Sequence, residues 1–235
     1  MEQLEHKSFL FGILNHLFGG DAAHPVVPDH VIMACFIAIF LTLGGLWFRS
    51  KIRVEEPGRL QLVLEALVGA LQGMLDENVG PKGRQFLSLV GTLGLFILFC
   101  NLAGLIPGLS SPTTNLNVPV GCALVSFLYY NYQGVRAHGL VSYLKHFLGP
   151  VLPLAIIMLP IEIISHLSRV LSLSVRLFGN IFGEELVILV LASLIPFLVP
   201  LPMMAFAIFG SMLQAFVFIM LTMIYLGGAV AMEEH

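Results

Sequence analysis

Long apolar runs constrain this chain more than any other feature. Residues 31–48 read VIMACFIAIFLTLGGLWF, and runs of similar character follow at 86–106 and 203–232. A helix needs about 20 apolar residues to cross the hydrocarbon core of a membrane. The chain is 57% hydrophobic and only 11% charged, whereas a soluble domain carries about 25% charged residues. The sequence therefore predicts an all-α polytopic membrane protein.

The hydropathy pattern predicts one integral membrane domain with about five membrane-embedded helices. Their expected ranges are 30–48, 86–106, 117–134, 150–195 and 203–232. Two mixed segments, 57–78 and 135–149, are expected to lie on the cytoplasmic membrane surface as interfacial segments. One helix over 150–195 would measure about 69 Å, against a hydrocarbon core of about 30 Å. We therefore expect a long helix or a helix pair lying steeply tilted within the membrane, with the last two membrane helices long and strongly tilted.

Basic residues outside the long run at 150–195 fall almost entirely on one side of this layout. The exception is Lys7, in the N-terminal segment 1–29, which carries no recognisable signal peptide. Lysine and arginine mark the cytoplasmic side of a membrane protein. The pattern predicts an extracytoplasmic N-terminus and a cytoplasmic C-terminus. The basic residues on the predicted cytoplasmic side are Arg49, Lys51, Arg53, Arg59, Lys82, Arg84, Arg136 and Lys145.

The run 150–195 carries a stripe of polar side chains. With Glu162 as the reference and about 100° per residue, the stripe also contains His166, Arg169, Arg176, Asn180 and Glu184, with Ser172 close by. Glu185 lies about 180° from Arg176, on the opposite face. An arginine that faces lipid at mid-bilayer costs at least about 2.5 kcal/mol. The stripe is therefore expected to face protein or water.

Several of these residues also have a structural interpretation. Arg169 could extend to the membrane interface, and Arg176 could form an ion pair with Glu184, eight residues later on the same face. His166 is as consistent with a hydrogen-bonded interior histidine as with a proton carrier. Acidic residues within a membrane segment indicate an ion path or a proton relay by default.

The sequence gives no indication of a cofactor, a metal or a nucleotide site. No GxxxxGK(S/T) loop and no GxGxxG motif after a strand is present. Cys35, Cys100 and Cys122 lie within apolar runs without CxxC spacing, so we interpret them as small apolar side chains. No nucleic-acid partner is expected.

Several motifs resemble subunit a of F-type ATP synthases. They are RLFGN at 176–180, EL at 185–186, LQAFVF at 213–218 and the closing EEH. The likeness covers most of the chain, because three further motifs are similar to the same family. These are NLAGLIPG at 101–108, PTTNLN at 112–117 and TxxYL at 222–226.

The resemblance implies a stator channel subunit that is not catalytic on its own. In that family, two offset half-channels carry an ion to and from carboxylates on a rotating c-ring, which couples the ion gradient to ATP synthesis. The ion is expected to be H⁺, with Na⁺ as the alternative. The implied partners are the c-ring, the peripheral-stalk subunit b, the rest of the complex and membrane lipid. The implied location is the bacterial cytoplasmic (inner) membrane.

The resemblance also assigns roles to single residues. The essential arginine corresponds to Arg176, and the asparagine four residues later to Asn180. The channel acid corresponds to Glu185, and the glutamine of the last helix to Gln214. An arginine suits the first role because it stays charged when buried, and at about 4 Å it would stabilise an ionised carboxylate by about 4 kcal/mol at an effective dielectric constant of about 20.

Two more positions and one departure complete the resemblance. Glu162 corresponds to an upstream acid near the cytoplasmic half-channel, and Arg169 to a basic residue seven before the essential arginine. Some members carry an ionisable histidine seven residues before the glutamine of the last helix, where this chain has Ala207. Glu184, His166 or water is the expected substitute, unless the ion path itself differs.

The opposite face of the stripe has an expected partner as well. Ser211, Gln214, Thr222 and Tyr225 recur along one side of the run 203–232. Glu185 is expected to face these residues across a water-filled path, which would form one half-channel.

Three other classes of protein agree less well with the sequence. A secondary transporter would show paired inverted halves, which this sequence lacks. A haem- or quinone-binding respiratory subunit would need histidine pairs on facing spans, but His166 is the only histidine in the interior of a span, since His30 lies at the first position of its range. A purely structural membrane anchor would leave the polar stripe unexplained.

Overall fold

The computed structural model describes residues 8, 11–12, 27–53, 57–80, 83–106, 108–143, 155–194 and 200–230. The regular elements in these ranges are α2 (Asp29–Arg49), α3 (Arg59–Val79), η2 (Gly83–Phe86), α4 (Leu87–Ala103), η3 (Pro112–Thr114), α5 (Asn117–His138), α7 (Ala155–Leu194) and α8 (Pro200–Val230). All are helical, which confirms the all-α class. Lys7, Lys82, Lys145 and the closing EEH lie outside the described residues.

The helices differ from the predicted ranges at two ends in particular. The helix predicted to reach residue 106 is shorter, because the chain turns at Gly104 and 104–106 is no longer helical. The helix that begins at Asn117 is longer than predicted and ends at His138, before Gly139, whose φ of 82° breaks it. The predicted interfacial segment 135–149 therefore begins inside α5, while the predicted segment 57–78 forms α3.

Three of the described helices are long and apolar enough to cross a membrane. They are the segments Asp29–Arg49, Gly83–Ala103 and Leu201–Val230. Together with the helical content, they bear out a polytopic membrane protein. A membrane-embedded position for α5 and α7, and with it the count of five membrane helices, stays a prediction.

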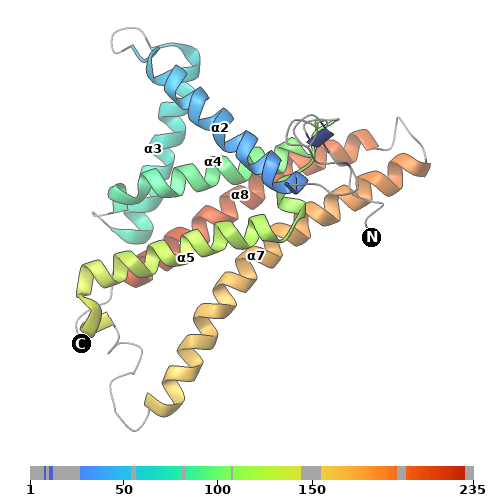
Figure 1. Ribbon diagram of the computed structural model, residues 1–235. Coiled ribbons are helices and arrows are strands. Elements are labelled where there is room, and N and C mark those ends of the chain that lie inside the picture. The colour runs from blue at the N-terminus through green and yellow to red at the C-terminus, as the bar shows by residue number, and fades with distance from the viewer. Residues whose placement is uncertain are drawn as a thin grey trace.

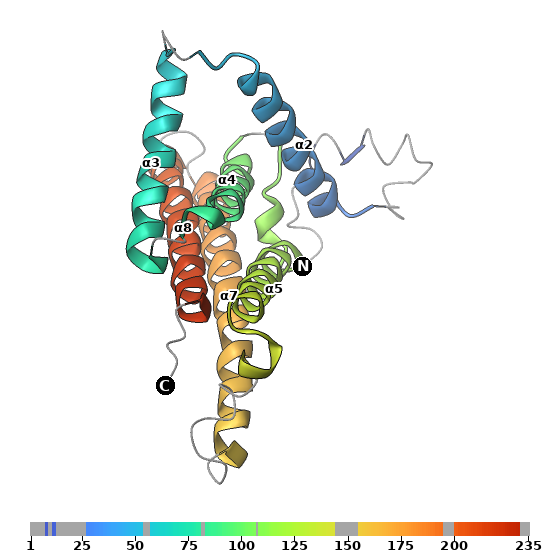
Figure 2. The ribbon, with the colours of Figure 1, turned by 90° about the vertical axis from the view of Figure 1, so that its left-hand side faces the viewer.

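Helix α8 lies at the centre of the bundle and packs against α3, α4, α5 and α7. Figures 1 and 2 show α4, α5, α7 and α8 close together; in Figure 2, α3 runs beside α8, and α2 lies on the other side of α4. A glycine allows one of these contacts, because a side chain at Gly227 would collide with the backbone of Asn78 in α3. The central residues of α8 therefore bury their side chains on several sides.

Helix α7 is one continuous helix of 40 residues, with Pro160 near its beginning. At 1.5 Å per residue it is about 60 Å long, roughly twice the hydrocarbon thickness. This finding favours the long helix over the helix pair. Its N-terminal turns extend beyond the other helices in both views (Figures 1 and 2).

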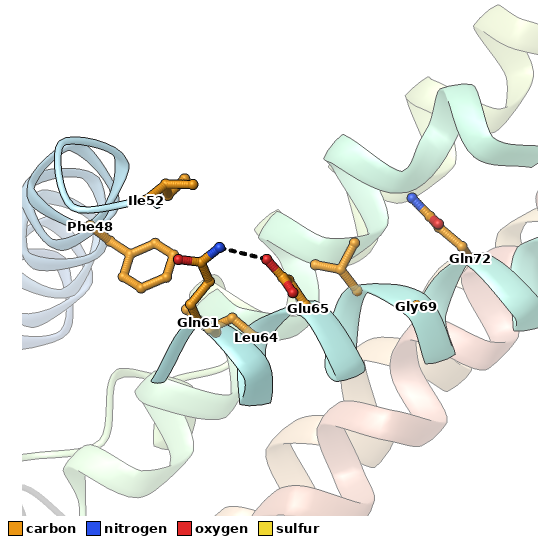
Figure 3. Close-up of a pocket in the computed structure, with 8 residues that line it drawn as sticks. Phe48, Ile52, Gln61, Leu64, Glu65, Gly69 and Gln72 are labelled. Carbon is orange, nitrogen blue, oxygen red and sulfur yellow. Dashed lines mark hydrogen bonds between the residues drawn. The ribbon is translucent and has the colours of Figure 1, made fainter. Parts of the chain in front are cut away.

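The corner between α2 and α3 is held by one glutamine. The Gln61 amide accepts a hydrogen bond from the Arg53 backbone N–H (3.1 Å) and donates one to the Arg53 carbonyl (2.9 Å). It also donates to Glu65 at 2.7 Å, as Figure 3 shows. A shallow groove of about 250 Å³ follows this corner, lined by Phe48, Ile52, Gln61, Leu64, Glu65, Val68, Gly69 and Gln72.

Candidate functional site

The polar stripe of α7 meets α8 in a fixed antiparallel register. The Arg169 guanidinium lies 5.1 Å from the centre of the Tyr225 ring. Eleven residues further along α7, the Asn180 amide donates a 2.8 Å hydrogen bond to the Gln214 side chain, which lies eleven residues back along α8. The stripe therefore faces protein at these positions, as its periodicity predicted.

The same register continues to Glu184. A Cβ atom on Gly210 would collide with the Glu184 carboxylate, so the acid occupies space that only glycine leaves free. Glu184 lies four residues after Asn180 on α7, and Gly210 lies four residues before Gln214 on α8. The buried Ala207 is three residues further back along α8. An acid thus reaches α8 within one helical turn of Ala207.

Arg176 lies between the contacts of Arg169 and Asn180, and its side chain is exposed. Its neighbour Leu177 is fully buried in the core between α4, α5 and α8, which fixes the face that Arg176 presents. Across the ranges that the structure describes, the Arg176 side chain forms no hydrogen bond or ion pair. The alternative of an ion pair with Glu184 therefore has no support in this geometry.

Glu185 faces the loop after α4. Its carboxylate oxygen lies 2.7 Å from the place where a Cβ on Gly104 would be, and the Ser111 side chain meets the same place at 2.8 Å. This position corrects the prediction that Glu185 faces the last helix. Neighbouring residues on a helix point about 100° apart. Glu184 therefore makes the contact with α8, and Glu185 points towards Gly104 and Ser111 instead.

Buried hydroxyl and amide groups continue from Ser111. Its hydroxyl donates to the Cys100 carbonyl at 2.9 Å and lies 2.8 Å from the Thr113 hydroxyl. Thr113 donates to the Asn101 side-chain oxygen at 2.8 Å, while the buried Asn101 Nδ2 has no partner among the described residues. We call Glu185, Ser111, Thr113 and Asn101 the hydroxyl cluster.

Asp29, in the first turn of α2, adjoins this cluster through Ser110. Its carboxylate accepts a hydrogen bond from the Ser8 hydroxyl at 2.7 Å and another from the Ser110 hydroxyl. Neither Asp29 nor any member of the hydroxyl cluster except Glu185 was predicted as a site residue. The sequence did contain a signal for two of them, because the motifs NLAGLIPG and PTTNLN, which carry the family resemblance, contain Asn101 and Thr113.

A second polar group lies near the other end of α7. The Nδ1 atom of His166 is 3.0 Å from the Tyr130 hydroxyl, and its Nε2 atom is 3.4 Å from a Glu162 oxygen. The rings of Phe127 and Tyr225 pack beside Tyr130. We call these five residues the aromatic cluster.

The three cysteines lie in the helices α2, α4 and α5. All three are free thiols; Cys100 and Cys122 are buried, and Cys35 is exposed. In the part of the chain that the structure describes, no group of three or more His, Cys, Asp or Glu residues could hold a metal ion.

Comparison with known proteins gives a consistent result. The family model described as "ATP synthase A chain" matches residues 30–227. ATP synthase subunit a 1 of Syntrophotalea carbinolica is 44% identical over 235 residues, 100% of this chain and 92% of the relative. ATP synthase subunit a of Geobacter sulfurreducens is 44% identical over 217 residues, 92% and 90% of the two chains. ATP synthase subunit a of Campylobacter concisus is 42% identical over 230 residues, 97% of each chain.

Proposed function

This chain belongs to the ATP synthase A chain family, and from that premise we propose that it conducts H⁺ through two offset half-channels to and from the carboxylates of a rotating c-ring. Membership makes it a membrane-sector subunit of a bacterial ATP synthase. Na⁺ is the alternative ion. The subunit performs no bond chemistry on ATP; its task is to couple the ion gradient to rotation.

The observation that carries the proposal is the position of Arg176. Its side chain is exposed, has no hydrogen-bond or ion-pair partner in the described ranges, and lies between the aromatic cluster and the hydroxyl cluster. Along α7 it is about 21 Å from Glu162 and about 14 Å from Glu185. An unpaired arginine in this position supports the proposal that its charge interacts with a carboxylate on another subunit.

The chemistry of the arginine follows from its fixed charge. When a ring carboxylate passes, the guanidinium stabilises its ionised form, so the carboxylate releases its proton on one side and takes another after passing. The same charge repels protons, which keeps the two half-channels separate. The hydrogen bond between Asn180 and Gln214 supports this role by holding α7 against α8 beside the arginine.

Each proposed half-channel has its own carboxylates. Glu185 and the hydroxyl cluster line the extracytoplasmic half-channel, and Glu162 with His166 lines the cytoplasmic one. Glu184 substitutes for the histidine that Ala207 replaces, because its carboxylate reaches α8 at Gly210. Arg169, packed on Tyr225, supports the cytoplasmic side.

The proposed partners and orientation follow from the same arrangement. The c-ring lies against the exposed face of Arg176, and subunit b and the rest of the complex hold the subunit in place. The N-terminus lies outside and the C-terminus in the cytoplasm, in the bacterial inner membrane. Support for this orientation comes from the basic residues of the predicted cytoplasmic side.

The test uses the assembled complex in vesicles. Arg176→Ala should abolish ATP synthesis under an imposed ion gradient. It should also leave a passive ion leak once the catalytic sector is removed, because the barrier between the half-channels is lost. Robust synthesis by Arg176→Ala, in a complex that assembles like the wild type, would show that the mechanism is wrong.

A further inference from the structure

His166 is held tightly in the aromatic cluster. Its side chain is only 12% exposed. The Tyr130 ring stacks on the imidazole, with 6.0 Å between centroids and 23° between planes, and Phe127 meets the imidazole edge-on at 6.0 Å. These contacts leave the imidazole little room to rotate.

The two nitrogens of His166 face different partners. Nδ1 lies 3.0 Å from the Tyr130 hydroxyl, which comes from α5. Nε2 lies 3.4 Å from a carboxylate oxygen of Glu162, one turn earlier on α7. A hydrogen bond at one ring nitrogen sets what the other nitrogen can do, so Tyr130 decides how His166 meets Glu162.

Other ionisable groups surround this pair. Arg169 lies on the same face of α7 and packs over the ring of Tyr225 from α8. Tyr143, which follows α5, donates a 2.8 Å hydrogen bond to Asn131. The Tyr130 hydroxyl oxygen can accept a hydrogen bond from an imidazole N–H.

We propose that Tyr130 is a positioning residue that directs Nε2 of His166 at Glu162, so that these two residues exchange a proton in the ion path. The inference rests on the proposed function. With the Tyr130 oxygen accepting from Nδ1–H, the lone pair of Nε2 faces the carboxyl group. The O–H bond of protonated Glu162 breaks and an N–H bond forms on Nε2, giving imidazolium and carboxylate. The reverse transfer restores both neutral groups.

Tyr130 suits this role in both charge states of the histidine. Nδ1 carries its proton before and after the transfer, so the same hydrogen bond persists throughout. The Tyr130 side chain is only 2% exposed, and its ring is fixed by Phe127 and Tyr225. Without the hydroxyl, no acceptor would hold the proton on Nδ1, so the imidazole could adopt either tautomer and the Nε2 lone pair would no longer be available to Glu162 throughout.

The experiment measures passive proton flux through the membrane sector in vesicles, with the catalytic sector removed, across the pH range in which histidine titrates. Tyr130→Phe keeps the ring and removes the hydroxyl. It should lower flux by about threefold to tenfold, as expected for one hydrogen bond. It should also move the midpoint of the pH profile to lower pH, because imidazolium loses an acceptor. Tyr129→Phe is the matched control, since Tyr129 packs on Phe86 away from the histidine.

A second variant keeps the test independent of folding. His166→Gln should flatten the histidine-like part of the profile, and adding Tyr130→Phe to it should cause no further loss, because the tyrosine acts through the histidine. Equal profiles for Tyr130→Phe and Tyr129→Phe, or losses that simply add in the double variant, would overturn the relay. If Arg176→Ala still abolishes ATP synthesis by the complete complex, the proposed function stands while this inference fails.

Discussion

The two ends of α7 hold their carboxylates in different surroundings. Glu162 lies beside an imidazole that two aromatic rings of α5 contact. Glu185 lies against Gly104 and Ser111, where small hydroxyl and amide groups are buried together. Hydroxyl and amide groups bind water readily, whereas an aromatic enclosure excludes it. The difference suggests a proton path through water at Glu185 and through a side-chain relay at Glu162.

The middle of α7 differs from both ends. There the register with α8 is fixed by Arg169 on Tyr225 and by Asn180 on Gln214. Arg176 lies between these contacts and is exposed. A rigid contact on either side would keep the arginine at a constant distance from both clusters, which is what a barrier between two half-channels requires.

The largest expected effect comes from changing this barrier. Arg176→Lys should lower ATP synthesis by at least about 100-fold, because an ammonium buried against the ring can lose its proton and lacks the planar fork of arginine. ATP synthesis under an imposed gradient is the measurement, with assembly checked by co-purification. Arg136→Lys, at the exposed end of α5, is the matched control. Near-normal synthesis by Arg176→Lys would mean that any positive charge suffices.

The next effect tests the hydroxyl cluster. Glu185→Gln keeps the shape of the side chain and removes its titratable group, so ion flux should fall by at least about tenfold, as for a lost proton-transfer group. Passive flux after removal of the catalytic sector measures this. The control is Glu77→Gln on the exposed surface of α3, which should leave flux unchanged. An unaltered flux in Glu185→Gln would remove this end of α7 from the ion path.

A smaller effect is expected where Glu184 meets α8. The added methyl group in Gly210→Ala would collide with the Glu184 carboxylate, and overpacking of this kind costs about 1–3 kcal/mol, so synthesis should fall about fivefold if the acid must move. ATP synthesis under an imposed gradient is again the measurement. Gly228→Ala on the same helix is the control, because a Cβ there meets nothing within 4 Å. In a Glu184→Ala background, Gly210→Ala should cause no further loss of synthesis. An equal loss in that background would show that the effect of Gly210→Ala does not depend on Glu184.

Part of this site could be predicted from the sequence, and part could not. Helical periodicity alone placed Arg169, Asn180 and Glu184 on one face, and that face does meet α8. Periodicity also placed Glu185 on the opposite face, but it does not say which element covers that face. Local spacing carries no information about a partner that comes from a distant part of the chain.

Tyr130 illustrates the same limit. It lies 36 residues before His166 in the sequence, in a helix whose apolar and polar residues give no reason to select one of its aromatic rings. Only the packing of α5 against α7 brings the hydroxyl to the imidazole. The all-α class was easier to predict, because apolar runs of spanning length are a local feature of the sequence.

The smallest functional effect is expected from a pair of labels at the two ends of α5. Asn117→Cys and Arg136→Cys are placed singly in a chain whose three cysteines are replaced by alanine. Both positions are exposed, and synthesis should stay within about twofold of the parent, as surface substitutions rarely matter.

Asn117 follows η3 and the hydroxyl cluster, whereas Arg136 lies near the contact between His138 and the end of α8. If the two clusters open to opposite sides of the membrane, an impermeant thiol reagent should label Asn117→Cys only from outside and Arg136→Cys only from the cytoplasmic side. Labelling of both from one side would contradict two opposed half-channels, whatever the effect of the other variants.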